Sequence, residues 1–163
     1  MRVLPALLVI PFVPALIGDQ RTPPHIKRTN PPALSRPTGY THVVEVSGPV
    51  RTNYIAGQVA ADKDGNVVGA ADMKAQAEQV FKNLESALAA AGATFADVVK
   101  MNTYATDLTN VQAIREVRAR YFGDVAPAST LVQVVRLARP EYLLEIEVIA
   151  AVRASAQPQP VSR

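Results

Sequence analysis

Apolar and polar residues divide the centre of the chain into short strand-like segments and two amphipathic helices. Apolar residues recur at helical spacing from Met73 to Ala91, between Asp72, a favourable N-cap, and Gly92, a favourable helix terminator. A second helix is predicted to start near residues 107–110 and to end at Gly123. Runs rich in β-branched and aromatic residues predict strands at residues 40–46, 53–61, 98–108, 129–137 and 143–152. This order predicts an α+β sandwich, a mixed sheet with two helices on one face.

Proline content separates both ends of the chain from this regular centre. Nine of the 13 prolines lie at or before Pro49, and none lies between residues 50 and 126. Residues 1–18 have a basic start and then an apolar run of 15 residues, shorter than the roughly 20 that span a bilayer as a helix, which predicts a signal peptide. An uncleaved interfacial anchor and a mis-assigned start are the alternatives. Residues 19–36 are interpreted as a proline-rich linker, 37–153 as the folded domain and 154–163 as a polar tail.

The expected location of the protein depends on whether residues 1–18 are a signal peptide. If it is real, the protein is exported, to the periplasm or the medium, and no membrane contact remains after its removal; otherwise the protein is cytoplasmic.

The composition of the chain excludes several kinds of partner and site. The chain has a net charge of +3, but residues 42–153 hold eleven basic and thirteen acidic side chains, interspersed with one another. A nucleic-acid binder relies on a basic face, so no nucleic-acid partner is expected. With no Cys and only two His, disulfides, thiolate zinc sites and histidine relays are excluded. The expected site therefore has no metal held by Cys or by a cluster of His.

The last predicted strand points to a partner. Residues 143–152 are apolar on both faces except for two carboxylates. A strand that is apolar on both sides in an antiparallel setting needs a cover on its outer face. In a chain of this size, we expect that cover to be another copy of the protein.

Candidate site residues lie on or near strand ends. Glu145 and Glu147 share one face of a strand, which suits a general base or a water-positioning carboxylate, or else ion pairs with Arg136 or Arg153. Ser129 and Thr130 offer hydroxyls to a ligand, or simply begin a strand. Gly57, inside a strand, marks either the close approach of a ligand or of backbone, or a bulge.

Taken in order along the chain, a set of short motifs resembles the RidA family, also called YjgF-like. The motifs are Gly57-Gln58-Val59, Asp64-Gly65, Gln76, Asn83-Leu84, Ala90-Ala91-Gly92-Ala93, Asp97-Val98-Val99-Lys100, Asp107-Leu108, Pro127-Ala128-Ser129-Thr130, Val134, Arg136-Leu137 and Glu145-Ile146-Glu147. The resemblance runs from about residue 26 to residue 153. It implies a chorismate-mutase-like α+β fold and a homotrimer with three small-molecule clefts between subunits.

The resemblance also implies a reaction, the cofactor-free hydrolysis of reactive enamines and imines to 2-keto acids and ammonia. It implies that Glu145 positions water, that Gly57 lines the cleft and that Tyr40 is an aromatic lid. The carboxylate-binding Arg of the archetype is replaced by Ser129, with Thr130 beside it. Arg115 is the candidate substitute cation, or else a solvated helix residue.

Three functions follow. The first is a RidA-like hydrolase or deaminase with an altered substrate, because Ser129 stands where the archetype has Arg. The alternative is a non-catalytic trimer that binds a small molecule in the same clefts. The third is an endoribonuclease, which the acidic balance of residues 42–153 and the scarcity of His disfavour.

Overall fold

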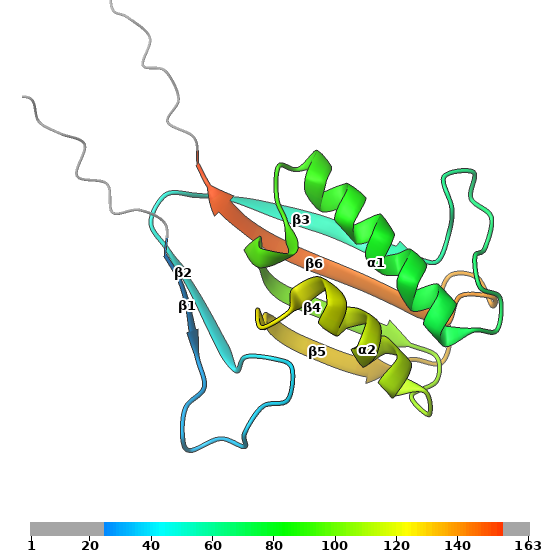
Figure 1. The fold of residues 1–163 in the computed structure, drawn as a ribbon, viewed down its shortest axis with the longest axis horizontal. Coiled ribbons are helices and arrows are strands. Elements are labelled where there is room, and N and C mark those ends of the chain that lie inside the picture. Colours follow the sequence, from blue (N-terminus) through cyan, green and yellow to red (C-terminus); the bar gives the residue numbers. More distant parts are fainter. Residues whose placement is uncertain (1–24, 155–163) are drawn as a thin grey trace, which may run out of the picture.

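The computed structural model describes residues 25–154, which form a four-stranded sheet, two helices on one face of it, and a two-stranded hairpin to one side (Figure 1). The predicted signal peptide, the first part of the predicted linker and the tail from residue 155 lie outside the described residues. Within residues 25–154, no helix combines the length and the apolar character needed to cross a membrane.

The sheet has the strand order β3 (Val50–Val59), β6 (Leu144–Arg153), β4 (Val98–Ala105), β5 (Ala128–Gln133). β6 runs antiparallel to both β3 and β4, whereas β4 and β5 are parallel and are joined through a helix. The predicted mixed sheet with two helices on one face is therefore confirmed. β6 is a central strand, and its alternate residues Leu144, Ile146, Val148, Ala150 and Val152 are buried towards the helices. Its other face carries Glu145 and Glu147, both half-buried.

Helix α1 (Met73–Ala90) begins where the sequence predicts. The Asp72 carboxylate accepts the backbone N–H groups of Lys74 and Ala75 at 2.9 and 3.1 Å, which satisfies two of the donors left free at a helix start. Gly92, with φ of +64°, follows its end. A short 3₁₀ turn, η1 (Phe95–Asp97), leads into β4, and helix α2 (Val111–Phe122) connects β4 to β5.

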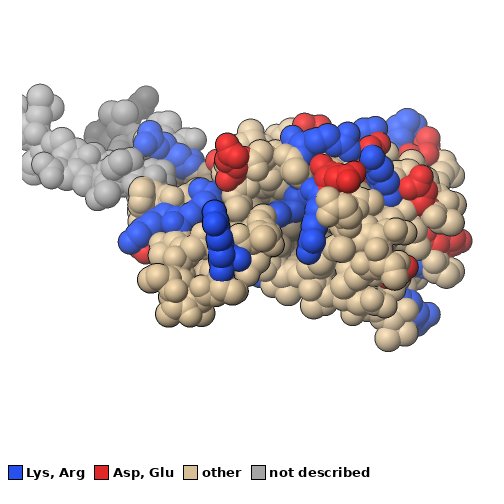
Figure 2. Space-filling view, turned by 60° about the horizontal axis from the view of Figure 1, so that its bottom comes forward, with Lys and Arg blue, Asp and Glu red and all other residues tan. Residues whose placement is uncertain are grey.

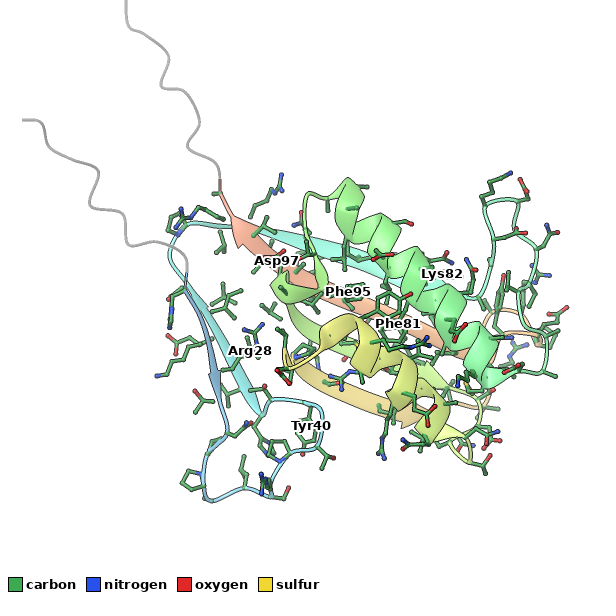
Figure 3. The ribbon with its side chains drawn as sticks, in the orientation of Figure 1. Arg28, Tyr40, Phe81, Lys82, Phe95 and Asp97 are labelled. Carbon is green, nitrogen blue, oxygen red and sulfur yellow. The ribbon has the colours of Figure 1, made fainter. Side chains whose placement is uncertain are left out.

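Four aromatic rings hold the two helices and η1 together against the sheet. Phe81 of α1 stacks on Tyr121 of α2 at a centroid distance of 5.1 Å, and Phe95 lies 5.1 Å from both Tyr121 and Phe122. Figure 3 shows Phe81 and Phe95 in the layer between the helices and the sheet. Such pairs contribute about 0.5–1.5 kcal/mol each beyond the area they bury, so this cluster fixes α2 relative to the sheet.

Gln76 of α1 is fully buried and connects the helix to the start of β6. Its Nε2 donates to the Glu141 carbonyl at 2.7 Å, and its Oε1 accepts the Leu143 N–H at 2.8 Å. Asn83, two turns later, donates to the Val59 and Ala61 carbonyls at 2.9 Å each. These bonds hold the ends of β3 and β6 at which the candidate residues Gly57 and Glu145 lie.

Strand β1 (His25–Thr29) and its pairing with β2 (Val43–Ser47) are the part of the fold that the sequence did not predict. The two strands are antiparallel, so a strand lies within residues interpreted as linker. Only Gly48 and Pro49 separate β2 from β3, yet the two strands diverge and the hairpin lies beside the sheet (Figure 1). Among the described residues, the outer edge of β3 has no strand partner.

The loop between β1 and β2 is attached to the body of the fold at one point. The Thr41 N–H donates to the Pro127 carbonyl at 3.0 Å, and the Thr41 hydroxyl donates to the Ala126 carbonyl at 2.6 Å. Thr41 is buried, at 4% exposure, so both bonds are shielded from water. They hold the neighbouring Tyr40 near the start of β5.

Strands β4 and β5 end earlier than expected. β4 ends at Ala105 instead of residue 108, because the Asp107 carboxylate accepts the N–H and the hydroxyl of Thr109 and turns the chain towards α2. β5 ends at Gln133 instead of residue 137.

Candidate functional site

A cavity of about 620 Å³ lies between α2, the helix-facing side of β4 and β5, and the loop that carries Tyr40. Three of the sequence-predicted site residues line it: Tyr40, Arg115 and Ser129. Figure 3 shows Tyr40 in the loop between β1 and β2, which Thr41 anchors. The structure thus brings together residues that are up to 89 positions apart in the chain.

The pleat of the parallel pair decides which side chains enter this cavity. Ser129 lies opposite Met101, and Leu131 lies opposite Thr103. Because side chains alternate between the two faces of a strand, all four face the helices. Together with Ile114 of α2 they form a mostly apolar wall in which the hydroxyls of Ser129 and Thr103 are the polar groups.

Arg118 of α2 also lines the cavity, and the sequence analysis missed it. Its Nε and Nη2 are buried and have no hydrogen-bond partner within residues 25–154. The guanidinium carbon lies 5.2 Å from the centroid of the Phe122 ring, at cation–π distance. Its Nη1 lies beside Gly39, where an added Cβ would approach it to 2.8 Å. Burial lowers the pKa of Arg118 from its ordinary value.

Arg115, the predicted substitute cation, is exposed, although it lies at the rim of the same cavity. Residues three apart on a helix share a face, so Arg118 was within reach of the same sequence argument. No local pattern separates the two arginines, because the difference in burial comes from Phe122 and from the loop at Gly39.

Gly57 and Glu145 meet on the opposite face of the sheet. β3 is irregular between Ile55 and Gln58, and a Cβ added to Gly57 would collide with Oε1 of Glu145 and lie 2.8 Å from its Cδ and 3.0 Å from its Cγ. The irregular register fits the bulge alternative raised for Gly57, and the group that approaches it is the Glu145 side chain rather than a ligand or backbone. The missing side chain leaves the space that the Glu145 carboxylate occupies.

Glu147 lies two residues further along this face. It accepts hydrogen bonds from Asn102 Nδ2 at 2.7 Å and from the Tyr104 hydroxyl at 3.1 Å. The pKa of Tyr104 is raised mainly by the hydrogen bond from its hydroxyl to the Glu147 carboxylate, and to a smaller extent by desolvation. Among the described residues, neither Glu145 nor Glu147 pairs with Arg136 or Arg153, so the ion-pair alternative is not what the structure shows.

Thr130 belongs to the same face as Glu147 and does not line the cavity. Its register partner on β4 is Asn102, and its hydroxyl accepts a hydrogen bond from Lys100 Nζ at 2.8 Å. Within residues 25–154, His, Asp and Glu side chains form no group of three that could hold a metal ion.

Comparisons with known proteins agree with this architecture. The family described as Endoribonuclease L-PSP matches residues 32–152. The chain belongs to this family. A RutC family protein of Pyrococcus horikoshii is 39% identical over 97 residues, which cover 60% of this chain and 76% of that protein.

Two solved structures support the assignment to the L-PSP family. This family includes proteins called RidA and YjgF. The Rid family protein YyfB of Yersinia pestis is 40% identical and has a TM-score of 0.72. The match covers 78% of this chain and 98% of that one. RidA from an Antarctic Psychrobacter is 34% identical, with a TM-score of 0.59 over 72% of this chain and 92% of that one.

In this L-PSP family chain, the six predicted site residues divide equally between two faces. Tyr40, Arg115 and Ser129 surround the cavity on the helix side, while Gly57, Glu145 and Thr130 lie on the other face of the sheet. The sheet separates the two groups. A single copy therefore does not bring Glu145 to the cavity.

Charge on this L-PSP chain is mixed. On the face shown in Figure 2, red acidic groups interrupt the blue basic groups across the described residues, and no continuous basic band crosses it. Pairs such as Arg120 with Glu78, at 2.8 Å, account for part of this mixing.

Proposed function

We propose that the protein hydrolyses a small imine or enamine metabolite, and that each site forms between two copies. The observation that carries this proposal is the division of the predicted residues between the two faces of the sheet. In the proposed homotrimer, the Glu145 face of one copy lies against the cavity of the next, which agrees with the clefts between subunits that the family resemblance implies.

The open face of the sheet supports such an assembly. Tyr54 is 78% exposed on it, and its register partner Ile149 of the central strand is half-buried on the same face. Apolar and aromatic groups of this kind are typical of the buried centre of an interface between copies. Contact at this face covers the last strand on its outer side, as the sequence predicts.

The proposed reaction adds water to a carbon–nitrogen double bond. Glu145 accepts a proton from water as the water oxygen bonds to the imine carbon, and that proton passes to nitrogen. The hydroxyl proton of the resulting carbinolamine then passes through Glu145 to nitrogen, the carbon–nitrogen bond breaks with its electron pair going to nitrogen, and ammonia leaves a carbonyl product. Every atom comes from the imine and water, so the reaction needs no redox partner. Positioning of the water and proton transfer supply the rate.

The substrate differs from the archetypal one because Ser129 offers a hydroxyl where the resemblance places a guanidinium. Hydrogen bonds to charged groups contribute roughly 1.5–3 kcal/mol each, so a lost bidentate contact weakens carboxylate binding at this position by several powers of ten. Carboxylate recognition therefore has to come from another part of the cavity, or the substrate is neutral.

Ammonia release from enzymatically generated 2-imino acids tests the activity, with wild type compared with Glu145→Gln. Removal of a general base is expected to lower the rate by about 10²–10⁴-fold. Glu141→Gln is the matched control, since Glu141 is an exposed glutamate whose carboxylate lies 3.8 Å from Arg139. Equal rates in wild type and Glu145→Gln would contradict the proposed role.

Co-expression tests whether sites are shared between copies. Glu145→Gln and a cavity-filling Ser129→Leu variant are each expected to be inactive alone. Random mixing in a closed oligomer restores about a quarter of the sites, because such a site takes an intact half from each variant. If mixed oligomers have no activity, the site does not span two copies.

The alternative that a specific observation favours is ligand binding without turnover, because the cavity, with the hydroxyls of Ser129 and Thr103 on an apolar wall, can hold a small molecule whether or not Glu145 acts. Calorimetry with 2-keto acids distinguishes the two. Binding with no ammonia release from any imine supports the binder and contradicts the hydrolase.

A further inference from the structure

We propose that Tyr104 is a second catalytic residue of the site between copies, and that its phenol oxygen accepts the N–H groups of the substrate nitrogen when that nitrogen becomes positively charged. Glu147 is the positioning residue that holds the phenol. This inference rests on the proposed function and assigns the nitrogen side of the same reaction.

Tyr104 lies directly beside Glu145 on the open face of the sheet. The two are register partners on β4 and β6, and side chains directly opposite each other in an antiparallel pair have Cβ atoms about 4.5–5.5 Å apart. On the β3 side, the register partner of Glu145 is Val59, and Gly57, against which its carboxylate packs, has no side chain. Of these neighbours on the two flanking strands, Tyr104 is the one with a polar group.

The open face also leaves this phenol accessible to a ligand. Tyr104 is half-buried, and its register partner on β5, Val132, is 40% exposed. The residues on either side of it in the chain, Thr103 and Ala105, are the ones that are buried towards the helices. A small molecule seated at Glu145 therefore lies over the same surface as the Tyr104 hydroxyl.

Hydrogen bonds hold the phenol in place and leave its oxygen free to accept. The Tyr104 hydroxyl donates to Oε1 of Glu147 at 3.1 Å, and the same Oε1 accepts Asn102 Nδ2 at 2.7 Å. Because the O–H proton is used in the bond to Glu147, the lone pairs of the phenol oxygen are available to a donor on a ligand. An N–H that donates to this oxygen completes a chain N–H···O–H···O⁻, in which each bond strengthens the next.

The charges around the phenol favour a cationic nitrogen. Glu147 forms no ion pair within residues 25–154, and Lys100, on the same face, donates to Thr130 instead. The hydrogen bond to Glu147, desolvation and the charges of Glu147 and Glu145 raise the pKa of Tyr104, so the phenol keeps its proton and does not act as an acid. The carboxylates that oppose a phenolate attract a positive nitrogen to the same place.

The proposed reaction passes through such a nitrogen. When the hydroxyl proton of the carbinolamine has moved through Glu145 to nitrogen, the nitrogen is positively charged until the carbon–nitrogen bond breaks and its electron pair leaves with ammonia. Tyr104 and Glu147 stabilise this species more than the neutral imine, so they lower the barrier rather than tighten substrate binding. Tyr104 neither gains nor loses a proton, and the balance of atoms is unchanged.

Steady-state ammonia release from enzymatically generated 2-imino acids tests the role of the hydroxyl, with wild type compared with Tyr104→Phe. The kcat is expected to fall by about 10–100-fold and KM to change by less than about threefold, because the lost hydrogen bond forms after the substrate has bound. Tyr121→Phe is the matched control, since it removes the same atom from a half-buried tyrosine on the helix side of the sheet, and its kcat is expected to stay within about twofold of wild type.

The role of Glu147 is tested in two backgrounds. Glu147→Gln keeps the size and an acceptor oxygen but removes the charge, so kcat is expected to fall by about tenfold with KM nearly unchanged. In Tyr104→Phe the same substitution is expected to lower kcat by less than about twofold, because the group through which it acts is gone. Equal losses in both backgrounds would overturn the positioning role of Glu147.

The outcomes separate this inference from the proposed function. A wild-type kcat in Tyr104→Phe, or a loss confined to KM, would overturn the role of Tyr104, while a low rate in Glu145→Gln in the same assay would leave the hydrolase standing. No ammonia release from wild type would overturn both.

Discussion

Substitution of Gly57 by Ala tests whether a single missing side chain positions the candidate carboxylate. The backbone tolerates the change, because Gly57 is not among the residues with positive φ. The added Cβ collides with Oε1 of Glu145 and comes to 2.8 Å from its Cδ. Glu145 must therefore rotate away, and its carboxylate moves by about 1 Å or more, a displacement that can lower a catalysed rate by roughly 100-fold.

The expected cost in stability is small by comparison. Overpacking costs about 1–3 kcal/mol, and the end of a half-buried glutamate yields more easily than backbone, which favours the lower limit. Loss of glycine flexibility in the unfolded chain returns about 0.4–1 kcal/mol. We expect a net destabilisation of about 0–1 kcal/mol, a shift of only a few degrees in melting temperature for a domain of this size.

Urea unfolding and ammonia release of four proteins measure both effects: wild type, Gly57→Ala, Glu145→Ala and the double variant. Without the Glu145 carboxylate, Gly57→Ala is expected to be neutral or stabilising, so the coupling energy between the two positions is about 1 kcal/mol. Equal destabilisation by Gly57→Ala in both backgrounds would show that the collision is not with Glu145. Full activity in Gly57→Ala would show that the reaction does not depend on the position of this carboxylate.

Three further predictions concern the scaffold around the site. Gln76→Leu leaves the Leu143 N–H and the Glu141 carbonyl without partners and is expected to cost about 2–5 kcal/mol in urea unfolding; a loss below about 1 kcal/mol would contradict the role of this side chain in joining α1 to β6. Asp72→Ala removes the N-cap of α1 and is expected to lower the free energy of unfolding by about 1 kcal/mol, whereas Asp72→Asn keeps a capping side chain and is expected to lose much less. Equal losses in both variants would rule out capping as the cause. Glu147→Gln is expected to lower the raised pKa of Tyr104 towards about 10, and ultraviolet titration of the phenolate measures this pKa. The folded state holds the Tyr104 proton more tightly than the unfolded state, so this contribution to stability is complete below about pH 10 and is lost as pH rises through the folded pKa. The stability of Glu147→Gln is therefore expected to fall less steeply with alkaline pH than that of wild type. An identical alkaline decline in the two proteins would refute the link.

The helices and the sheet could be predicted because their signals are local. Asp72 and Gly92 mark the ends of α1, and the apolar residues of 143–152 mark a strand that needs cover on both faces. Strand β1 could not be predicted in this way, since it is five residues long and proline-rich segments surround it. Its pairing with β2 depends on residues about 20 positions away, which no window of local pattern includes.

The candidate site shows a different limit. Alternation along a strand predicts that Glu145 and Glu147 share a face, but it does not predict which face the helices cover or that Ser129 lies on the other one. That separation follows from packing of α2 over β4 and β5, and it is the reason that the proposed site needs two copies.

That Ser129 and Arg118 line the same cavity could be found only after both elements were placed. Ser129 reaches it from β5 and Arg118 reaches it from α2. In the sequence, Arg118 is one of three arginines within six residues of a helix, and nothing local distinguishes it. Its burial arises from contacts with Phe122 and with the loop at Gly39, both set by tertiary packing. Which charged groups line a cavity is therefore decided by how strands and helices pack, and a sequence motif on one strand describes only one of its walls.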